Sequence, residues 1–221
     1  MNQERWSAVD TYFEEALIGR DPVLDNALET SRATGLPDIQ VASNQGKLLS
    51  MIARIYGAAR ILEVGTLGGY STIWLARALP DTGSIVTLEL DPKHAAVARQ
   101  NMDDAGYSGQ VEIRVGRAVD SLAAMVEAGE GPFDFIFIDA DKPSNPHYLD
   151  YAVKLSRSGT LIVVDNVVRN GGVADPQSTD PNVIGVRTMI DQIAADPRLD
   201  ATAIQTVGGK GYDGFALIHV R

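Results

Sequence analysis

A chain of 221 residues, 45% of them hydrophobic and 22% charged, can bury one substantial core, and we expect a single domain over residues 1–221. The absence of cysteine excludes disulfides, thiolate catalysis and cysteine-ligated metals, so the chemistry must use oxygen and nitrogen groups. The formal net charge of −10 disfavours a nucleic-acid partner, because it repels phosphate backbones. With no apolar run long enough to cross a bilayer and no signal-peptide pattern in residues 1–5, we expect a cytoplasmic protein without a membrane partner.

The first 57 residues predict helices that precede a core spanning residues 58–221. Apolar side chains recur at helical spacing from Trp6 to Leu17, which indicates an amphipathic helix that covers another part of the protein. A second helix is expected over residues 43–56, and Gly57 is its predicted stop.

From Ile61 onward, short apolar runs alternate with helical stretches. The runs cover residues 61–64, 85–90, 111–115, 133–138 and 161–164, and the helical stretches cover residues 71–79, 91–102 and 147–155. The pair Asp91-Pro92 is a good helix start, with a capping carboxylate and proline at the first helical position. Nearly continuous aliphatic strands separated by helices are typical of a doubly wound α/β sheet with parallel strands buried on both faces.

The last third of the chain predicts a loop, a helix and a hairpin. Residues 166–181 are rich in turn signals and predict an exposed, mobile loop of the kind that borders active sites. A helix over residues 183–195 follows, and then strands 202–207 and 215–220 surround the glycine-rich turn 208–211. The prediction is therefore a mostly parallel, seven-stranded Rossmann-like sheet with a C-terminal antiparallel hairpin and extra N-terminal helices.

A glycine turn follows the first predicted strand, at the position where doubly wound folds bind a ligand. Its pattern, Gly65-x-x-Gly68-Gly69, differs from the dinucleotide motif G-x-G-x-x-G, and Glu63 just before it would repel a pyrophosphate. A carboxylate at that position instead suits a cationic amino group or a hydroxyl. Glu89, at the end of the next strand, occupies the usual position of an acid that binds both hydroxyls of a ribose. Either acid alone could be a simple strand-end residue, but together with the glycines they favour S-adenosylmethionine.

Three oxygen-bearing side chains end the fourth and fifth predicted strands. Asp139 follows one strand, and Asp165 and Asn166 follow the next, so all three can converge beyond the carboxyl edge of a parallel sheet. Such hard ligands suit Mg²⁺, or Mn²⁺ or Ca²⁺, and not zinc. The alternative is that each aspartate caps the next helix, the role that we expect for Asp141.

Lys142 would lie at the edge of this cluster. Partial burial and a neighbouring cation both favour the neutral amine, which is the form that a general base requires, although most lysines are solvated surface charges. The histidines carry no comparable argument, since His94 is expected in a helix, His147 at a helix start and His219 in the final strand.

Taken together, these segments resemble the cation-dependent, catechol-type S-adenosylmethionine-dependent O-methyltransferases, which include caffeoyl-CoA O-methyltransferases. The resemblance covers nearly the whole chain and is most specific at residues 62–71, 137–142, 165–166 and 213–217. It implies metal ligation by Asp139, Asp165 and Asn166, with Lys142 and Asp139 as the catalytic residues. It also implies a methyl-donor site lined by Val41, Glu63, Gly65, Ser71, Glu89, Ala118 and Asp139.

The resemblance further implies transfer of a methyl group to a small phenolic or catecholic acceptor. Because the family commonly pairs and the first helix presents Trp6 and Phe13, we also expect a homodimer. Residues 143–148 and 167–181 depart from the family pattern, so the acceptor itself stays open. The alternatives are methylation of a hydroxylated tRNA base by the same chemistry, a nicotinamide oxidoreductase, which the glycine spacing disfavours, and a binding-only protein that has kept the cofactor pocket.

Overall fold

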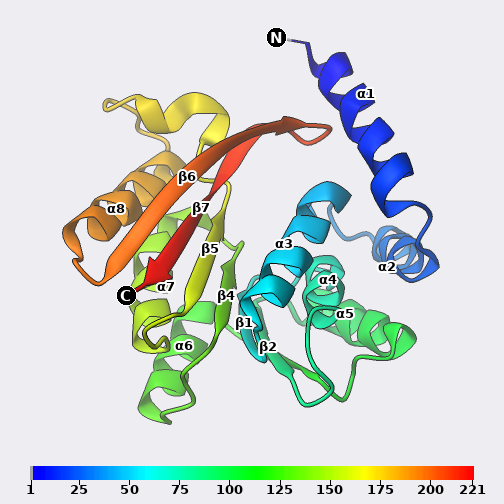
Figure 1. Cartoon of the computed structure of the whole chain (residues 1–221), viewed down its shortest axis with the longest axis horizontal. Helices are drawn as coiled ribbons and strands as arrows, with labels where there is room; N and C mark the ends of the chain where they lie inside the picture. The colour runs from blue at the N-terminus through cyan, green and yellow to red at the C-terminus, as the bar shows by residue number, and fades with distance from the viewer. Residues whose placement is uncertain (1) are drawn as a thin grey trace.

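The computed structural model describes residues 2–221 as a central sheet with helices on both faces (Figure 1). Before the sheet lie α1 (Gln3–Phe13), the π-helical turn η1 (Glu14–Ile18), α2 (Pro22–Ala33) and α3 (Ser43–Tyr56). The core continues with β1 (Arg60–Val64), α4 (Tyr70–Ala76), β2 (Ser84–Glu89), α5 (Pro92–Ala105), β3 (Val111–Val115), α6 (Ala118–Glu127) and β4 (Phe135–Ile138). It ends with η2 (Lys142–Ser144), α7 (Asn145–Lys154), β5 (Leu161–Asp165), η3 (Arg169–Ala174), α8 (Pro181–Ala195), β6 (Leu199–Gly208) and β7 (Gly211–Val220).

The sheet has seven strands in the order β3-β2-β1-β4-β5-β7-β6, and this confirms the predicted fold class. The first five strands are parallel, and β7 pairs antiparallel with both β5 and β6. The chain order reverses between β1 and β4, where an open α/β sheet leaves a crevice beyond the carboxyl ends of its strands. The ends of β1, β2, β4 and β5 therefore meet at one edge.

Two apolar cores lie on opposite faces of this sheet. One gathers side chains of α6, α7 and α8 against the sheet, and the other gathers those of α2, α3, α4 and α5. Phe135 and Phe137 face the second core while Ile136 and Ile138 face the first, as the twofold alternation of a strand requires. All four residues of β4 are fully buried, which explains why the sequence shows an uninterrupted apolar run.

Several local predictions are confirmed. Gly57 ends α3 in the left-handed conformation, and the Asp91 side chain caps α5 by accepting a hydrogen bond from the Lys93 amide at 2.7 Å. Asp141 caps η2, as expected, by accepting from the Ser144 amide at 3.2 Å. His94 and His219 lie in α5 and β7, and His147 lies in the first turn of α7.

Other predictions need correction. The helices α2 and α6 were not anticipated, and β4 begins at Phe135, two residues later than predicted. Residues 166–181 are only partly the exposed loop expected: residues 174–177 are exposed, whereas Val167 and Val168 are buried and η3 follows them. The two valines pack into the core beside α8, and this anchors the start of the segment.

The first helix contacts the far hairpin and not the core. None of the residues of α1 is buried, and in Figure 1 the helix stands apart from the sheet while the long β6–β7 ribbon arches toward it. Gln3 donates to the Gly208 carbonyl at 2.8 Å, and Asp10 accepts from the Gly209 amide at 2.7 Å. Within residues 2–221, no helix is long and apolar enough to cross a membrane.

Candidate active site

A cavity of about 810 Å³ opens at the edge where the parallel strands end. Its walls come from the loop before α3, from the turns that follow β1, β2, β3, β4 and β5, and from the start of α8. Of the residues predicted from the sequence, eight line it: Val41, Gly65, Ser71, Glu89, Ala118, Asp139, Lys142 and Asn166. Glu63 and Asp165 are buried and are not among the lining residues.

The turn after β1 brings the backbone close to the next strand end. Gly65 has a φ of +100°, and a Cβ at this position would overlap the carbonyl oxygen of Asp139. Leu67 takes a φ of +51°, which is uncommon for a residue other than glycine, and Gly69 at +81° leads into α4. This turn leaves a backbone surface that a ligand can approach closely.

The carboxylate of Glu89 holds that turn in place. One oxygen accepts from the amides of Thr66 at 3.2 Å and Leu67 at 2.7 Å, and the other accepts from the Asp91 amide at 2.9 Å. The Nδ1 atom of His94 lies 3.5 Å from the same carboxylate. A carboxylate offers about four lone-pair sites and the three amides use three of them, so Glu89, which lines the cavity, can still accept a further hydrogen bond. It therefore has a structural role that the sequence did not reveal.

Glu63 is fully buried beneath the turn. Its carboxyl accepts hydrogen bonds from the hydroxyls of Ser71 at 2.6 Å, Thr72 at 2.5 Å and Thr87 at 2.7 Å. Burial outweighs these three bonds and, with a small contribution from Asp139, raises the pKa of Glu63 to about 7. Within this network, only Ser71 reaches the cavity wall, so Glu63 can act on a ligand through that hydroxyl.

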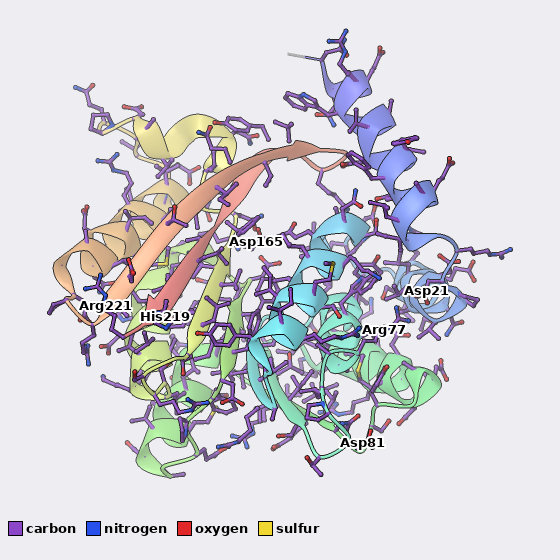
Figure 2. The ribbon with its side chains drawn as sticks, viewed as in Figure 1. Asp21, Arg77, Asp81, Asp165, His219 and Arg221 are labelled. Atoms are coloured by element: carbon purple, nitrogen blue, oxygen red, sulfur yellow. The ribbon has the colours of Figure 1, made fainter. Side chains whose placement is uncertain are left out.

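The ends of β4 and β5 carry a compact group of charges. The Nζ of Lys142 donates to Asp139 Oδ1 at 2.9 Å, and the lysine side chain is only 8% exposed. Asp165 lies at the end of β5 near the middle of the molecule (Figure 2). Burial and the neighbouring Asp139 carboxylate raise the pKa of Asp165, while Gln45 and Lys142 oppose the shift. The two aspartates therefore repel each other and compete for Lys142.

The packing of α8 fixes the lysine. A Cβ at Gly185 would overlap the carbonyl of Lys142, so only glycine lets α8 pack this closely against η2. Asn166 follows Asp165 in a left-handed conformation with a φ of +57°, which directs the chain back along the cavity. The backbone amide of Asn166 donates to Asp165 Oδ1, with 2.8 Å between nitrogen and oxygen.

Some residues of the cavity wall were not predicted. Tyr148 donates its hydroxyl to Asp141 at 2.5 Å, and burial together with this bond raises the pKa of the phenol. His94, Arg117, Arg169 and Asn182 line the cavity as well. A sequence signal existed for His94 and Arg117, which lie a few residues beyond predicted strand ends. One existed also for Arg169, which lies in the predicted loop 166–181 of the kind that borders active sites, but none existed for Asn182, which follows that loop.

The sheet order, the glycine turn and the acids at successive strand ends define an α/β protein that binds a nucleoside-like ligand in a crevice. The family model described as O-methyltransferase matches residues 16–219. The chain therefore belongs to the O-methyltransferase family, and the predicted enzyme class, an S-adenosylmethionine-dependent O-methyltransferase, is confirmed.

Individual relatives are similar over their whole length. The catechol O-methyltransferase of Niastella koreensis is 51% identical over 221 residues, which are 100% of each chain. The solved O-methyltransferase from Bacillus cereus in complex with SAH is 52% identical with a TM-score of 0.98, and all of both chains is covered. TomG from Streptomyces achromogenes, an O-methyltransferase involved in tomaymycin synthesis and solved in complex with SAM, is 49% identical with a TM-score of 0.95, covering 100% of this chain and 99% of that chain.

Proposed function

We propose that the protein transfers the methyl group of S-adenosylmethionine to one hydroxyl of a small catechol-like acceptor, with a divalent cation bound beside the acceptor. One observation carries the proposal: a single cavity joins the Glu89 side of the glycine turn to the Asp139–Lys142 pair at 2.9 Å. The name of the Niastella koreensis relative and the ligands in the two solved relatives support the acceptor class and the donor.

The donor would lie along the ends of β1, β2 and β3. Glu89 has a free lone-pair site for ribose hydroxyls, and Ala118 at the start of α6 suits the flat face of an adenine. Ser71 and Gly65 line the side nearer the reacting centre, where Glu63 supports the Ser71 hydroxyl from behind. Val41 covers the cavity from the loop before α3.

The donor set at the ends of β4 and β5 fits a hard divalent cation. Two carboxylates, Asp139 and Asp165, and the amide oxygen of Asn166 are the kind of ligand that Mg²⁺ or Mn²⁺ prefers. Burial and the neighbouring Asp139 carboxylate raise the pKa of Asp165, and a bound cation would favour its ionised form. When bound, the cation would lower the pKa of an acceptor hydroxyl and orient the ring.

The chain's own groups would then move the proton and hold the reactants. In its neutral form, Lys142 Nζ would take the proton of the acceptor hydroxyl, and Asp139 would keep that amine in place through their hydrogen bond. The acceptor oxygen forms its bond to the methyl carbon as the sulfur–carbon bond breaks, and the product sulfide leaves as a neutral group. Most of the acceleration would come from holding the oxygen and the methyl group in line.

The test is methyl transfer from S-adenosylmethionine to catechols in the presence and absence of a chelator. We expect a chelator to abolish transfer and Mg²⁺ or Mn²⁺ to restore it. Asp165→Ala should remove activity and leave donor binding, measured by calorimetry, largely intact. The matched control is Asp200→Ala, which removes an exposed aspartate on β6 that pairs with Arg221 at 3.5 Å, and it should behave like the parent. Full activity in excess chelator would refute the cation's role.

We also propose that the protein is a homodimer. The support is that α1 buries none of its residues, while Val9, Tyr12, Phe13 and Leu17 of α1 and η1 are 44–70% exposed. Exposed apolar side chains grouped on one helix are typical of a protein–protein contact.

A further inference from the structure

Arg169 lies at the end of the cavity opposite the donor side. It follows β5, whereas Glu89 and Ala118 follow β2 and β3, and β1 and β4 lie between them in the sheet. Both Arg169 and Asn182 line the cavity on this side, which is the acceptor end if the donor lies along β1–β3. The Asp139–Lys142 pair, which follows β4, therefore lies between the proposed donor side and Arg169.

The guanidinium of Arg169 is poorly satisfied. It has five N–H donors, and within residues 2–221 the structure gives its side chain no hydrogen bond. Its one charge contact is Asp213 Oδ2 at 3.5 Å, and its Nε is buried without a partner. A buried donor without an acceptor costs free energy, so an acceptor from a ligand would stabilise this arrangement.

The two carboxylates near Arg169 are already engaged. Asp213 Oδ1 accepts from the amides of Val168 at 2.9 Å and Arg169 at 3.0 Å. Asp180 caps α8 by accepting from the Asn182 amide at 2.8 Å. Asp213 contacts the guanidinium as an ion pair at 3.5 Å, and within residues 2–221 neither carboxylate accepts a hydrogen bond from it. The Arg169 side chain is 29% exposed, so it is open to a ligand and still partly shielded from water.

We propose that Arg169 binds a carboxylate carried by the acceptor, so that the preferred substrates are catechols with an acidic substituent, such as dihydroxybenzoates and dihydroxycinnamates. A guanidinium fork matches a carboxylate in geometry and charge, and such pairs are among the strongest polar contacts in proteins. The inference rests on the proposed function, because it assumes that the two ring hydroxyls lie at the Asp139–Lys142 end.

A purely structural role for Arg169 makes a different prediction. If the residue only holds the 168–174 segment through Asp213, then its loss should impair neutral and acidic acceptors alike. If it binds the acceptor's carboxylate, then its loss should impair acidic acceptors selectively. The ratio between two acceptors of the same shape therefore separates the two roles.

The experiment compares 3,4-dihydroxybenzoate with its methyl ester, which has the same ring hydroxyls and no negative charge. We expect the parent enzyme, with saturating donor and Mg²⁺, to show a kcat/KM about tenfold or more higher for the acid. Arg169→Met should remove this preference and change kcat/KM for the ester by no more than about threefold, while Arg169→Lys should keep part of it. Arg198→Met, which removes an exposed cation paired with Asp196, is the control and should leave the ratio unchanged.

Equilibrium binding supplies a second readout. Calorimetry measures the binding of the acid to the parent and to Arg169→Met, each loaded with S-adenosylhomocysteine so that no turnover occurs. Arg169→Met should bind the acid more weakly than the parent does, and thermal melts verify that the variant is folded. Equal loss for acid and ester, or a parent enzyme without preference for the acid, would overturn the role of Arg169 and leave the proposed function standing. A parent enzyme that methylates neither catechol would overturn both.

Discussion

The buried carboxyl of Glu63 makes the stability of this protein depend on pH in an unusual direction. The side chain is 0% exposed, and burial raises its pKa from 4.5 to about 7. Between those two values the folded protein keeps the proton on Glu63, whereas the unfolded chain releases it. Stability is therefore lost as the pH rises through this window, because the folded state must either hold a proton or bury a charge.

The magnitude follows from the size of the shift. Each pKa unit corresponds to about 1.4 kcal/mol, so a shift from 4.5 to about 7 corresponds to a penalty of about 3 kcal/mol, fully developed above pH 7 and absent below pH 4.5. Glu63→Gln removes the ionisation and keeps the shape of the neutral acid. The free energy of unfolding of this variant relative to the parent should therefore rise by about 3 kcal/mol between pH 4.5 and pH 8.

Chemical denaturation of the ligand-free proteins at fixed concentration, at several pH values from 4.5 to 8.5, measures this difference. Thr72→Val is the matched comparison. It is close in shape and removes the hydroxyl that donates to Glu63 at 2.5 Å, which helps to hold the pKa of Glu63 down. Its deficit relative to the parent should grow as the pH rises, opposite in sign to the trend of Glu63→Gln. A difference between Glu63→Gln and the parent that does not vary with pH would show that Glu63 is ionised in the folded protein and refute the reasoning.

Three further predictions concern the site and the assembly. Glu89→Ala leaves three backbone amides without their acceptor and removes the lone-pair site proposed to bind the methyl donor. Calorimetry should therefore show S-adenosylmethionine binding weakened by about 1–3 kcal/mol, and thermal melts should show a lower midpoint. Lys142→Met should still bind the cation, yet its pH–rate profile should lose the limb that belongs to the base. Light scattering at micromolar concentration should give twice the mass of one chain, and the mass of a single chain would contradict the dimer.

The strand and sheet predictions rested on the strongest signals in the sequence. Five apolar runs marked the parallel strands, and the glycine-rich turn 208–211 marked the hairpin. Of these strands, β4 and β5 are buried along their whole length, whereas β3 at the edge of the sheet has no buried residue. Helix α6 is followed by Gly129 and by the pair Gly131-Pro132, so its sequence carries a stop signal that the prediction did not use. Helix α2 has a capping Asp21 and Pro22 at its first position, so a signal was present and was overlooked.

The sequence could predict which strand ends carry the site, but it could not predict the hydrogen bonds that its residues make. Parallel strands bring their carboxyl ends to one edge, so the sequence alone could group the acids at the ends of β1, β2, β4 and β5. It could not show that Glu63 is buried and that Glu89 lines the cavity, because this depends on which hydroxyls and amides are within reach. Thr66 and Leu67, whose amides donate to Glu89, are 23 and 22 residues away from it in the chain, and no local pattern reports them.

Two turns at the cavity, one after β1 and one after β5, are held by carboxylates in the same way. This gives the segment 213–217 near the end of the chain a structural role at the cavity. After β1, Glu89 accepts hydrogen bonds from the successive amides of Thr66 and Leu67, and after β5, Asp213 accepts hydrogen bonds from those of Val168 and Arg169. The second residue of each pair, Leu67 or Arg169, has a positive φ. An anion that accepts from two neighbouring N–H groups can stabilise this backbone conformation. A carboxylate from a distant strand thus holds each strained turn in the shape that lines the cavity.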